Sequence, residues 1–530
     1  MLFDKESFLI DSKVAVPTDL SAFYGYCFNN EKLFHYKAEL PDLHELWQKR
    51  SQNTGVFCCV LSFENKTVIF SDPLSQYSLF YKIEQDGRFL ISNDIFSIAS
   101  NAECMIDQAA MLNCVSYFSP IGNNTLLEGV KTLKPYQYIE LTRNQNSLNF
   151  NIKDIEAVDF STSTYEELLA LCVNRIKQRA KAAIDSGVPI VQLTGGQDSR
   201  LSLAALLSVS EPERFRVSCF GGEQSEDKKI FNYLKKKFGL KETSMFLSGD
   251  KPGNFEEAKL VARVFNGLKH SAQSNFNCKF CPEHIEITGY FSEGLLKDFG
   301  NYFKGGIFSP FQYAKKVSVL PRHIFDAASF NLYEEISAKE LSGVSYAERL
   351  NWLYLNNRST AQMGAQSIAN NRCFIGADVI YDPFLIALYS KCPLTSQQKA
   401  EGALICELTR LLAGDALAFA PLAGASISCY GDFTKDDEPS IFNRVPLTEE
   451  FKNESHNPIR SYLYSIDTHK KSYHELFSTL EFKEFLKVYP VFEALTEQTY
   501  GQYSRKPEFE ALISIFGFWL ELKEICNSNA

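Results

Sequence analysis

The stretch that decides the fold is VPIVQLTGGQDSRLSLAALL, residues 188–207. Its first part, Pro189 to Leu193, is a short apolar run typical of a buried strand, and an Ala- and Leu-rich helical pattern resumes at Leu201. Gly195 and Gly196 lie between the two patterns. Because they carry no Cβ, their backbone can bend sharply and approach a ligand closely. The stretch therefore predicts a strand, a glycine loop and a helix, in that order.

The loop carries groups that suit phosphate. N–H groups at the beginning of a helix attract anions, and the Thr194 and Ser199 hydroxyls can bond phosphate oxygens. Asp198 is a hard oxygen ligand for a Mg²⁺ ion that bridges those oxygens. No Walker pattern is present. An ordinary strand-to-helix turn with Thr194 as N-cap is the alternative. We predict a nucleotide pyrophosphate site made by Leu193, Thr194, Gly195, Gly196, Gln197, Asp198, Ser199 and Arg200.

Composition limits the possible partners and compartment. A chain of 530 residues is expected to form two or three domains. The net charge of −10 opposes binding to nucleic acid over a broad surface. The 14 cysteines are scattered, the first residues lack a signal-peptide pattern, and no run approaches 18 apolar residues. We therefore expect a cytoplasmic protein with reduced thiols and with neither nucleic-acid nor membrane partners.

Residues 1–155 have a β pattern. Short runs rich in β-branched and aromatic residues alternate with turn formers, which predicts stacked antiparallel sheets. The runs are 55–62, 67–71, 78–82, 88–92 and 136–141, and short helices are expected over 93–99 and 107–116.

Residues 156–530 have an α/β pattern that becomes helical from about residue 320. Strands and helices first alternate, which predicts a doubly wound parallel sheet with ligands at the carboxyl ends of its strands. The expected elements are a helix over 164–186, strands over 189–193 and 215–221, and a helix over 223–238. Later helices are expected over 346–356, 382–390, 396–412, 473–488 and 509–522.

The string LTGGQDS, residues 193–199, resembles the PP-loop S-G-G-x-D-S of ATP pyrophosphatases, and with Arg200 it is most similar to the asparagine synthetase-like branch. That family activates a carboxylate with ATP as an acyl-adenylate, releases pyrophosphate, and lets a nitrogen nucleophile displace AMP. Residues 1–155 resemble its N-terminal glutaminase domain, an Ntn-type β-sandwich. The segments that carry this second resemblance are 55–57, 72–81, 91–94 and 124–130.

The glutaminase resemblance does not extend to the catalytic residues. A glutaminase of this type uses an N-terminal Cys whose own α-amine serves as the base. Leu2 follows Met1 here, and no Asn-Gly-Glu string for binding glutamine is present. Cys27 and Cys58 are internal and have no free α-amine beside them. We predict that this domain lacks glutaminase chemistry and serves as structural support or substrate docking.

A second important stretch is IEITGYFSEGLLK, residues 285–297. A strand is expected to end at Thr288-Gly289, and Glu293 opens a helix. The resemblance implies that Glu293 lies near the ATP phosphates and the reacting amine, with Lys297 in the place of a family Arg and Tyr302 in the aromatic place. Glu293 would then bind Mg²⁺ together with Asp198, or accept a proton. The alternative is a solvated Glu at a helix start. The bulky Tyr290, Phe291 and Ser292 would narrow or disable the entrance.

Other candidates follow from the resemblance alone. Phe220 and Gly221 would line the adenine through backbone groups, with Gly289 completing the site. Asp227 would organise the nucleotide site, or act only as a partner of the helix dipole. Segment 371–384, followed by Lys399 and Arg410, is similar to the family's R-x-P-F-L-D segment. Typical members then place a Lys near the α-phosphate, but residues 413–432 contain neither Lys nor Arg, which leaves Lys435 and Arg444 as candidates.

Cys278-Lys-Phe-Cys281 is a single C-x-x-C pair. Structural zinc needs two further ligands, and no second pair of suitable spacing accompanies it. Buried or incidental thiols are the favoured interpretation.

The function that follows is an ATP- and Mg²⁺-dependent ligase that forms an amide from a carboxylate without its own glutamine hydrolysis. The resemblance includes β-lactam synthetases and lasso-peptide cyclases, so the expected substrate is a small amino-acid-like carboxylate or a peptide, and a homodimer is compatible with the family. One alternative is a pseudoenzyme or scaffold that binds nucleotide without turnover. A nucleic-acid modifier is disfavoured, because no basic patch interleaved with aromatics is present.

Overall fold

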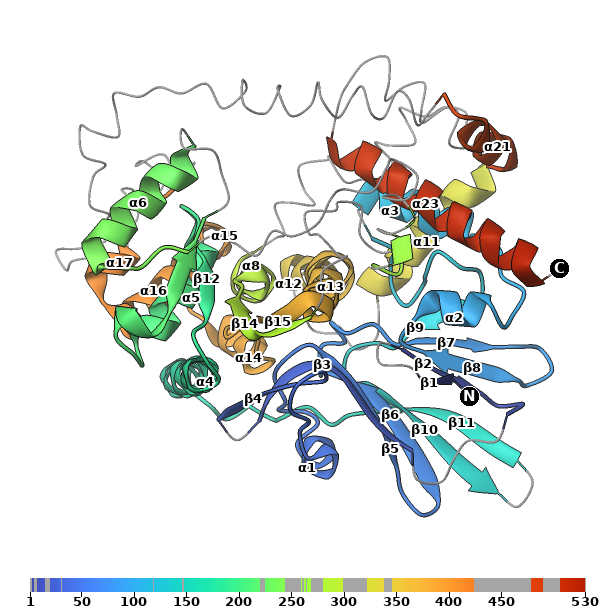
Figure 1. Cartoon of the computed structure of the whole chain (residues 1–530), viewed down its shortest axis with the longest axis horizontal. Helices are drawn as coiled ribbons and strands as arrows, with labels where there is room; N and C mark the ends of the chain where they lie inside the picture. The colour runs from blue at the N-terminus through green and yellow to red at the C-terminus, as the bar shows by residue number, and fades with distance from the viewer. Residues whose placement is uncertain are drawn as a thin grey trace.

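The computed structural model has a mixed α/β fold, with antiparallel sheets in the N-terminal part and a parallel sheet later (Figure 1). This arrangement confirms the sequence prediction at that level. The structure describes residues 2–3, 7–14, 20–29, 31–117, 119–144, 147–219, 225–243, 259, 262–263, 265–267, 280–298, 322–337, 346–423, 478–489 and 506–529.

The N-terminal part contains two antiparallel sheets. One has the strand order β11-β10-β6-β5-β3-β4 and the other the order β1-β2-β8-β7-β9. The strands of the first sheet are β3 (Ser21–Asn29), β4 (Lys32–His35), β5 (Phe57–Ser62), β6 (Lys66–Ser71), β10 (Gln137–Asn144) and β11 (Ser147–Asp154). Those of the second are β1 (Leu2–Phe3), β2 (Phe8–Asp11), β7 (Phe80–Ile83), β8 (Phe89–Ser92) and β9 (Val130–Thr132).

Alternating side chains explain why the sheets pack face to face. Tyr24 on β3 lies against Phe8 on β2, with ring centroids 5.7 Å apart, and both belong to one buried cluster. The preceding residue on β3, Phe23, faces the opposite side of the sheet and belongs to a second buried cluster that includes Phe70 and Leu46. Leu46 belongs to helix α1 (Leu43–Gln48). The six-stranded sheet is therefore apolar on both faces, one covered by the second sheet and the other by α1.

A layer of helices covers the outer face of the five-stranded sheet. Helices α2 (Ile95–Ala99), α3 (Gln108–Tyr117) and α23 (Lys506–Asn529) pack together there (Figure 1). Phe96 of α2 and Phe518 of α23 have ring centroids 4.9 Å apart. The helix expected over 509–522 is thus present, and it docks on the N-terminal part. Within the described ranges, no helix has the length and apolar character needed to cross a membrane.

The second part is organised around a parallel sheet with the order β13-β12-β14-β15. From β12 the chain proceeds to β13 on one side and only later to β14 and β15 on the other. The strand order therefore reverses at β12, and connections leaving such a point diverge to form a crevice at the carboxyl ends of the strands. The strands are β12 (Ile190–Gln192), β13 (Arg216–Ser218), β14 (Cys281–Ile287) and β15 (Phe374–Ala377).

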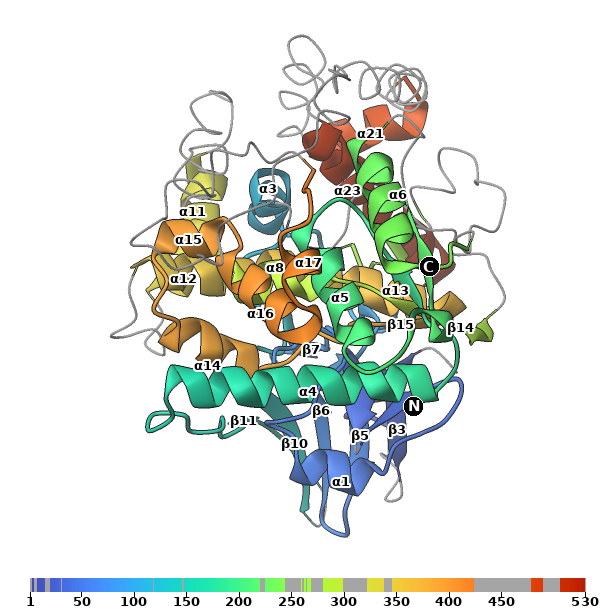
Figure 2. The same cartoon turned by 90° about the vertical axis from the view of Figure 1, so that its left-hand side faces the viewer.

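Helices pack around this sheet. Helix α4 lies between the parallel sheet and the N-terminal sheets (Figure 2), and it begins with a capping box in which Thr164 and Glu167 satisfy each other's backbone N–H groups. The principal helices are α4 (Tyr165–Asp185), α5 (Gln197–Leu207), α6 (Glu226–Phe238), α8 (Tyr290–Leu296), α14 (Phe384–Lys391), α15 (Ser396–Ala400) and α16 (Ala403–Ala413). The remaining described helices include α11 (Arg322–Ile336), α17 (Asp415–Ala418) and α21 (Leu480–Val488).

The two helix starts nearest the predicted site differ from the sequence prediction. Helix α5 begins at Gln197 rather than at Leu201, and its N-cap is Gly196, not Thr194 as in the alternative interpretation of the loop. Helix α8 begins at Tyr290 rather than at Glu293. The apolar pattern resumes late because the first turn of α5 carries polar residues, although the helix has already begun.

A long helical segment joins the two parts of the molecule. Helix α12 (Tyr346–Leu353) continues through a π-helical turn region, Tyr354–Gly364, into α13 (Ala365–Cys373). The fully buried Gln76, from the turn after β6, inserts its amide beside this region. Its Nε2 donates to the Leu355 carbonyl at 3.3 Å and to the Thr360 hydroxyl at 3.0 Å. The N-terminal part thus supplies hydrogen bonds to a helix of the second part.

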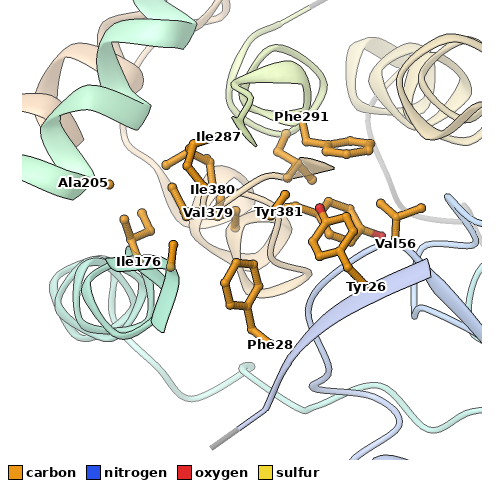
Figure 3. Packing of buried hydrophobic residues seen from close by; sticks show 14 of the residues in the cluster. Tyr26, Phe28, Val56, Ile176, Ala205, Ile287, Phe291, Val379, Ile380 and Tyr381 are labelled. Atoms are coloured by element: carbon orange, nitrogen blue, oxygen red, sulfur yellow. The ribbon is translucent and has the colours of Figure 1, made fainter. Parts of the chain in front are cut away.

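A buried carboxylate lies beside Gln76 at this junction. Asp72 accepts N–H groups from Gln76 at 3.1 Å and Tyr77 at 2.8 Å, and also the hydroxyl of Tyr381. Tyr381 comes from the segment after β15, and Figure 3 shows it beside Tyr26 of β3. Burial raises the pKa of Asp72 from 3.8 to about 6, although these hydrogen bonds oppose the rise. A single turn thus links β6 to both the helical segment and the parallel sheet.

We expect Gly364→Ala to destabilise the fold. A Cβ at this position would lie 2.2 Å from the backbone oxygen of Gln76, so the junction must shift. The expected loss is about 1–3 kcal/mol in urea denaturation. Gly294→Ala is the matched control, because this helical Cβ would meet only ordinary contacts from 3.5 Å outward. Equal stabilities for the two variants would contradict the close packing.

Asp72 predicts a pH dependence of stability. Because its pKa in the folded protein lies above the ordinary value, the fold disfavours the ionised form, and stability is lost as the pH rises from about 4 to about 6. Relative to Asp72→Asn, which does not titrate, the wild type should lose up to about 3 kcal/mol of unfolding free energy over this range. Urea denaturation at a series of pH values measures the difference, and a constant difference would refute the shift.

Candidate active site at the reversal of strand order

The candidate site lies where the segments after β12 and β14 diverge. The first segment contains Thr194, Gly195 and Gly196 and leads into α5, and the second contains Thr288 and Gly289 and leads into α8. Ser202 of α5 donates its hydroxyl to the Thr288 carbonyl at 3.0 Å. The two stretches that sequence reasoning selected are therefore neighbours at the carboxyl edge of the sheet.

Internal hydrogen bonds fix the glycine loop. The Thr194 N–H donates to the Ser199 Oγ at 3.0 Å, and the Gly195 N–H donates to Asp227 at 2.8 Å. Asp227 lies in the first turn of α6, so it holds the loop from the neighbouring helix. A Cβ on Gly195 would lie 2.7 Å from that of Ala423. These contacts give Asp227 a positioning role toward the loop.

The beginning of α5 has features that suit an anion. Its N-cap, Gly196, supplies no side-chain hydrogen bond to the first turn. The first N–H groups of a helix have no intrahelical partners, and the helix dipole adds positive potential there. A phosphate placed at this end would meet both.

Two carboxylates and a lysine meet beside the helix start. Asp198, in the first turn of α5, accepts Lys297 Nζ at 2.8 Å and the Ser292 hydroxyl at 3.0 Å. Glu293 of α8 accepts the Tyr354 hydroxyl at 3.3 Å. The structure therefore brings together Asp198, Glu293 and Lys297, the three charged residues that the sequence placed at the centre of the site.

The surroundings of Glu293 favour its protonated form. Burial raises its pKa, and the negative charge of Asp198 raises it further, whereas Lys297, Arg358 and the Tyr354 hydrogen bond lower it. Arg358 follows Tyr354 by four residues in the π-helical region, and its guanidinium carbon lies 6.0 Å from the centre of the Tyr354 ring. Sequence reasoning missed both residues. Tyr354 and Arg358 lie well after the stretches 193–200 and 285–297 in the sequence, so neither stretch pointed to them. Only their i, i+4 spacing indicates that they share one face of a helix.

Gly289 allows the two segments to approach each other. A Cβ on this residue would lie 2.8 Å from the Asp198 carbonyl oxygen and 3.1 Å from the Ser199 nitrogen. Only a residue without a side chain fits against this backbone. Gly289 therefore contributes to the site by holding α5 and α8 together.

Two residues of the predicted phosphate loop contact protein rather than the crevice. The buried guanidinium of Arg200 donates to the carbonyls of Ala420, at 2.7 Å, and Pro421. Gln197 donates to the Glu401 carbonyl at 3.1 Å. These contacts fix the segments after α17 and α15 against α5, which is a structural role.

The three residues at the start of α8 have different surroundings, and Ser292 alone of them contacts Asp198. Phe291 is fully buried against Tyr381, with ring centroids 4.5 Å apart, as Figure 3 shows. Its N–H donates to Asp378 at 3.0 Å. The Tyr290 hydroxyl lies 3.5 Å from the side-chain oxygen of Gln192 on β12. Phe291 thus fills the core under α8 and does not narrow the entrance.

The segment similar to R-x-P-F-L-D is a structural junction. Asp382 is completely buried and accepts hydrogen bonds from Arg175 at 2.6 Å and from Arg179, both on α4. Lys399 lies over the Tyr389 ring, 4.3 Å from its centre, and donates to the carbonyl of the same residue. Among the described residues, the contacts of Lys399 and Asp382 are with α4, Tyr389 and Phe384 and not with the cluster at Asp198. The candidates Phe220, Gly221, Tyr302, Lys435, Arg444 and Cys278 lie outside the described residues.

We expect Gly289→Ala to disturb the site, because the added Cβ must displace the first turn of α5. The loss of unfolding free energy should be about 1–3 kcal/mol. Gly196→Ala is the control, since its Cβ would meet only the Thr194 hydroxyl, at 3.3 Å, and its φ of −79° suits any residue. Urea denaturation of both variants measures this. A larger loss for Gly196→Ala would contradict the packing described.

Comparisons with known proteins do not identify a relative. No protein-family model matches the sequence, and no curated protein matches it. The chemistry of the cluster formed by Asp198, Glu293, Lys297, Tyr354 and Arg358 therefore follows from its residues and their geometry.

Proposed function

We propose that the protein is an ATP-dependent carbon–nitrogen ligase of the asparagine synthetase-like kind, which adenylates a carboxylate, releases pyrophosphate and transfers the acyl group to an amine. One observation carries the proposal. At the reversal of the strand order, the start of α5 meets two carboxylates, Asp198 and Glu293, that come from different segments. A crevice at this point of a parallel sheet is the usual ligand site of such folds.

The carboxylates fit a magnesium ion that accompanies ATP. Mg²⁺ in phosphate-transfer sites is bound by one or two carboxylates together with phosphate oxygens and water. Asp198 and Glu293 supply two such side chains, and within the described ranges no three His, Cys, Asp or Glu residues form a closed metal site. Mg²⁺ held there would neutralise charge on the phosphates. The Asp198–Lys297 ion pair would open to release its carboxylate oxygen.

The cations of the cluster suit a leaving pyrophosphate. Negative charge develops on the phosphate groups as the carboxylate attacks, and fixed positive charges stabilise it. Lys297, once released from Asp198, and Arg358 lie beside the carboxylates. Among the described residues, Lys297 and Arg358 are the candidates for the role that typical members of the family assign to a later Lys near the α-phosphate.

Glu293 suits the second step. An amine that attacks the acyl-adenylate must lose a proton, and a base whose pKa is raised toward neutrality accepts it best. Burial and Asp198 both move the pKa of Glu293 in that direction. As the alternative to binding Mg²⁺, Glu293 would receive the proton, with the Tyr354 hydroxyl holding its carboxylate in place.

The N-terminal part would act as support in this proposal. In this proposal the amine comes from a substrate and not from glutamine hydrolysis. The Asp72–Gln76 turn fixes the helical region that carries Tyr354 and Arg358. The substrate would be a small amino-acid-like carboxylate or a peptide.

A nucleotide-binding protein without turnover is the second candidate. It is favoured by the Asp198–Lys297 ion pair, because a protein cation already occupies the carboxylate that Mg²⁺ would use. In that case the crevice would bind nucleotide to hold a conformation rather than to activate a substrate.

The test is pyrophosphate release with ATP and Mg²⁺ across a panel of amino acids, amino-acid-like carboxylates and peptides. The wild type should release pyrophosphate with at least one of them, and Asp198→Asn should lower the rate about 100-fold or more while the circular dichroism spectrum is retained. Asp415→Asn, a change of an exposed first-turn Asp on α17, is the control and should keep full activity.

The other outcomes separate the alternatives. ATP binding without pyrophosphate release for any panel member supports the nucleotide-binding protein. Turnover retained in Asp198→Asn refutes the assigned role of this carboxylate. Release that depends on added RNA would point to a nucleic-acid modifier.

A further inference from the structure

A polar cavity of about 360 Å³ lies between the N-terminal part and α4. It is bounded by the end of β3, the segment that follows α1, and the second half of α4. None of its lining residues belongs to the cluster at Asp198. The lining residues are Phe28, Asn29, Glu31, Lys49, Gln52, Asn53, Thr54, Arg175, Gln178, Arg179 and Ala182.

Arg175 presents a fixed guanidinium at this cavity. Its Nε and Nη2 donate to Asp382, and Nη2 also donates to the Gln52 carbonyl at 2.8 Å. Its guanidinium carbon lies 4.1 Å from the centre of the Phe384 ring. Among the described residues Nη1 has no acceptor. The Arg175 guanidinium is thus held by Asp382, by the Gln52 carbonyl and by the Phe384 ring, while its Nη1 remains available. A guanidinium fixed in this way is already oriented to bind an anionic oxygen.

The guanidinium donors behind the cavity outnumber the acceptors that face them. Arg175 and Arg179 both donate to the carboxylate of Asp382, and the side chain of Arg179 is only 5% exposed. The Nη2 of Arg179 is buried and has no acceptor in the described part of the chain. Asp378 also interacts with Arg179, and Glu31 lines the cavity, so hydrogen-bond donors rather than a net positive charge would hold an anionic oxygen here.

The rest of the lining limits the charge of that anion. Lys49 is already paired with Glu45 at 2.7 Å, and Glu31 adds a negative charge at the cavity. Gln178 and Ala182 lie toward the C-terminal end of α4, where the helix dipole is negative and opposes dianions. Amide and hydroxyl groups make up much of the remainder. The lining thus fits one carboxylate attached to a polar, otherwise uncharged or zwitterionic body.

We propose that this cavity binds a small carboxylate of amino-acid size, with its carboxylate on the Nη1 edge of Arg175 and its polar remainder among the side chains of Asn29, Asn53, Thr54 and Gln178. The volume suits a ligand of that size. The site is separate from the crevice at the strand reversal, so it stands whether or not the proposed ligase activity is correct.

Gln178 offers a test that leaves the ion triad intact. It is exposed on α4, and none of the hydrogen bonds of the described residues involves it, so Gln178→Glu should fold normally. The new negative charge should weaken carboxylate binding about three- to tenfold by repulsion. Gln85→Glu makes the same change of net charge in the exposed β7–β8 turn, away from the cavity, and is the matched control.

The measurement is isothermal titration of the full chain, without ATP, with L-asparagine, L-glutamine, L-glutamate, succinate and inorganic phosphate. Saturable binding of at least one carboxylate, weakened in Gln178→Glu and unchanged in Gln85→Glu, supports the site. L-Glutamine amide, which lacks the carboxylate, should bind at least tenfold more weakly than L-glutamine if that amino acid binds. No carboxylate binding, binding of phosphate alone, or equal effects of the two variants would overturn the proposal.

Discussion

The turn after β6 is the constraint on which the arrangement of the whole molecule depends. Asp72 and Gln76 belong to the N-terminal part, yet their hydrogen bonds end on Tyr381 and on the π-helical region of the second part. Buried polar groups that lose one partner become costly, so each part requires the other for the stability of this junction. The N-terminal part therefore helps to fix the positions of Tyr354 and Arg358, although it lies outside the candidate site.

The candidate site is organised as a set of mutually compensated charges. Asp198 pairs with Lys297, and Glu293 interacts with Tyr354 and Arg358. These residues come from α5, α8 and the π-helical region, and α5 and α8 approach each other closely at Gly289. Such a cluster is stable without a ligand, and it can exchange its internal ion pair for interactions with phosphate or metal. The same property explains why the arrangement suits either a ligase or a protein that only binds nucleotide.

Local sequence patterns predicted the two sheet types, the strand–loop–helix unit and the position of Asp198, because glycines and polar residues at strand ends have short-range causes. Glu293 and Lys297 were selected from the family resemblance. The predicted start of α5 was wrong by four residues, because the first turn of this helix carries polar residues that contact other parts of the fold. Arg200 and Gln197 contact carbonyls that lie some 200 residues away in sequence. Tyr354 and Arg358 reach the candidate site from a π-helical region beside which the side chain of Gln76 inserts. Contacts of this range leave no local pattern.

The docking of α23 has a consequence for how the protein is made. Helix α2 lies directly on the outer face of the five-stranded sheet, and α23, from far later in the chain, packs on α2 and α3. During synthesis from the N-terminus, the apolar side chains that α23 covers stay exposed until residues 506–529 have left the ribosome. The nascent N-terminal part therefore presents an apolar surface to chaperones until this helix has been synthesised.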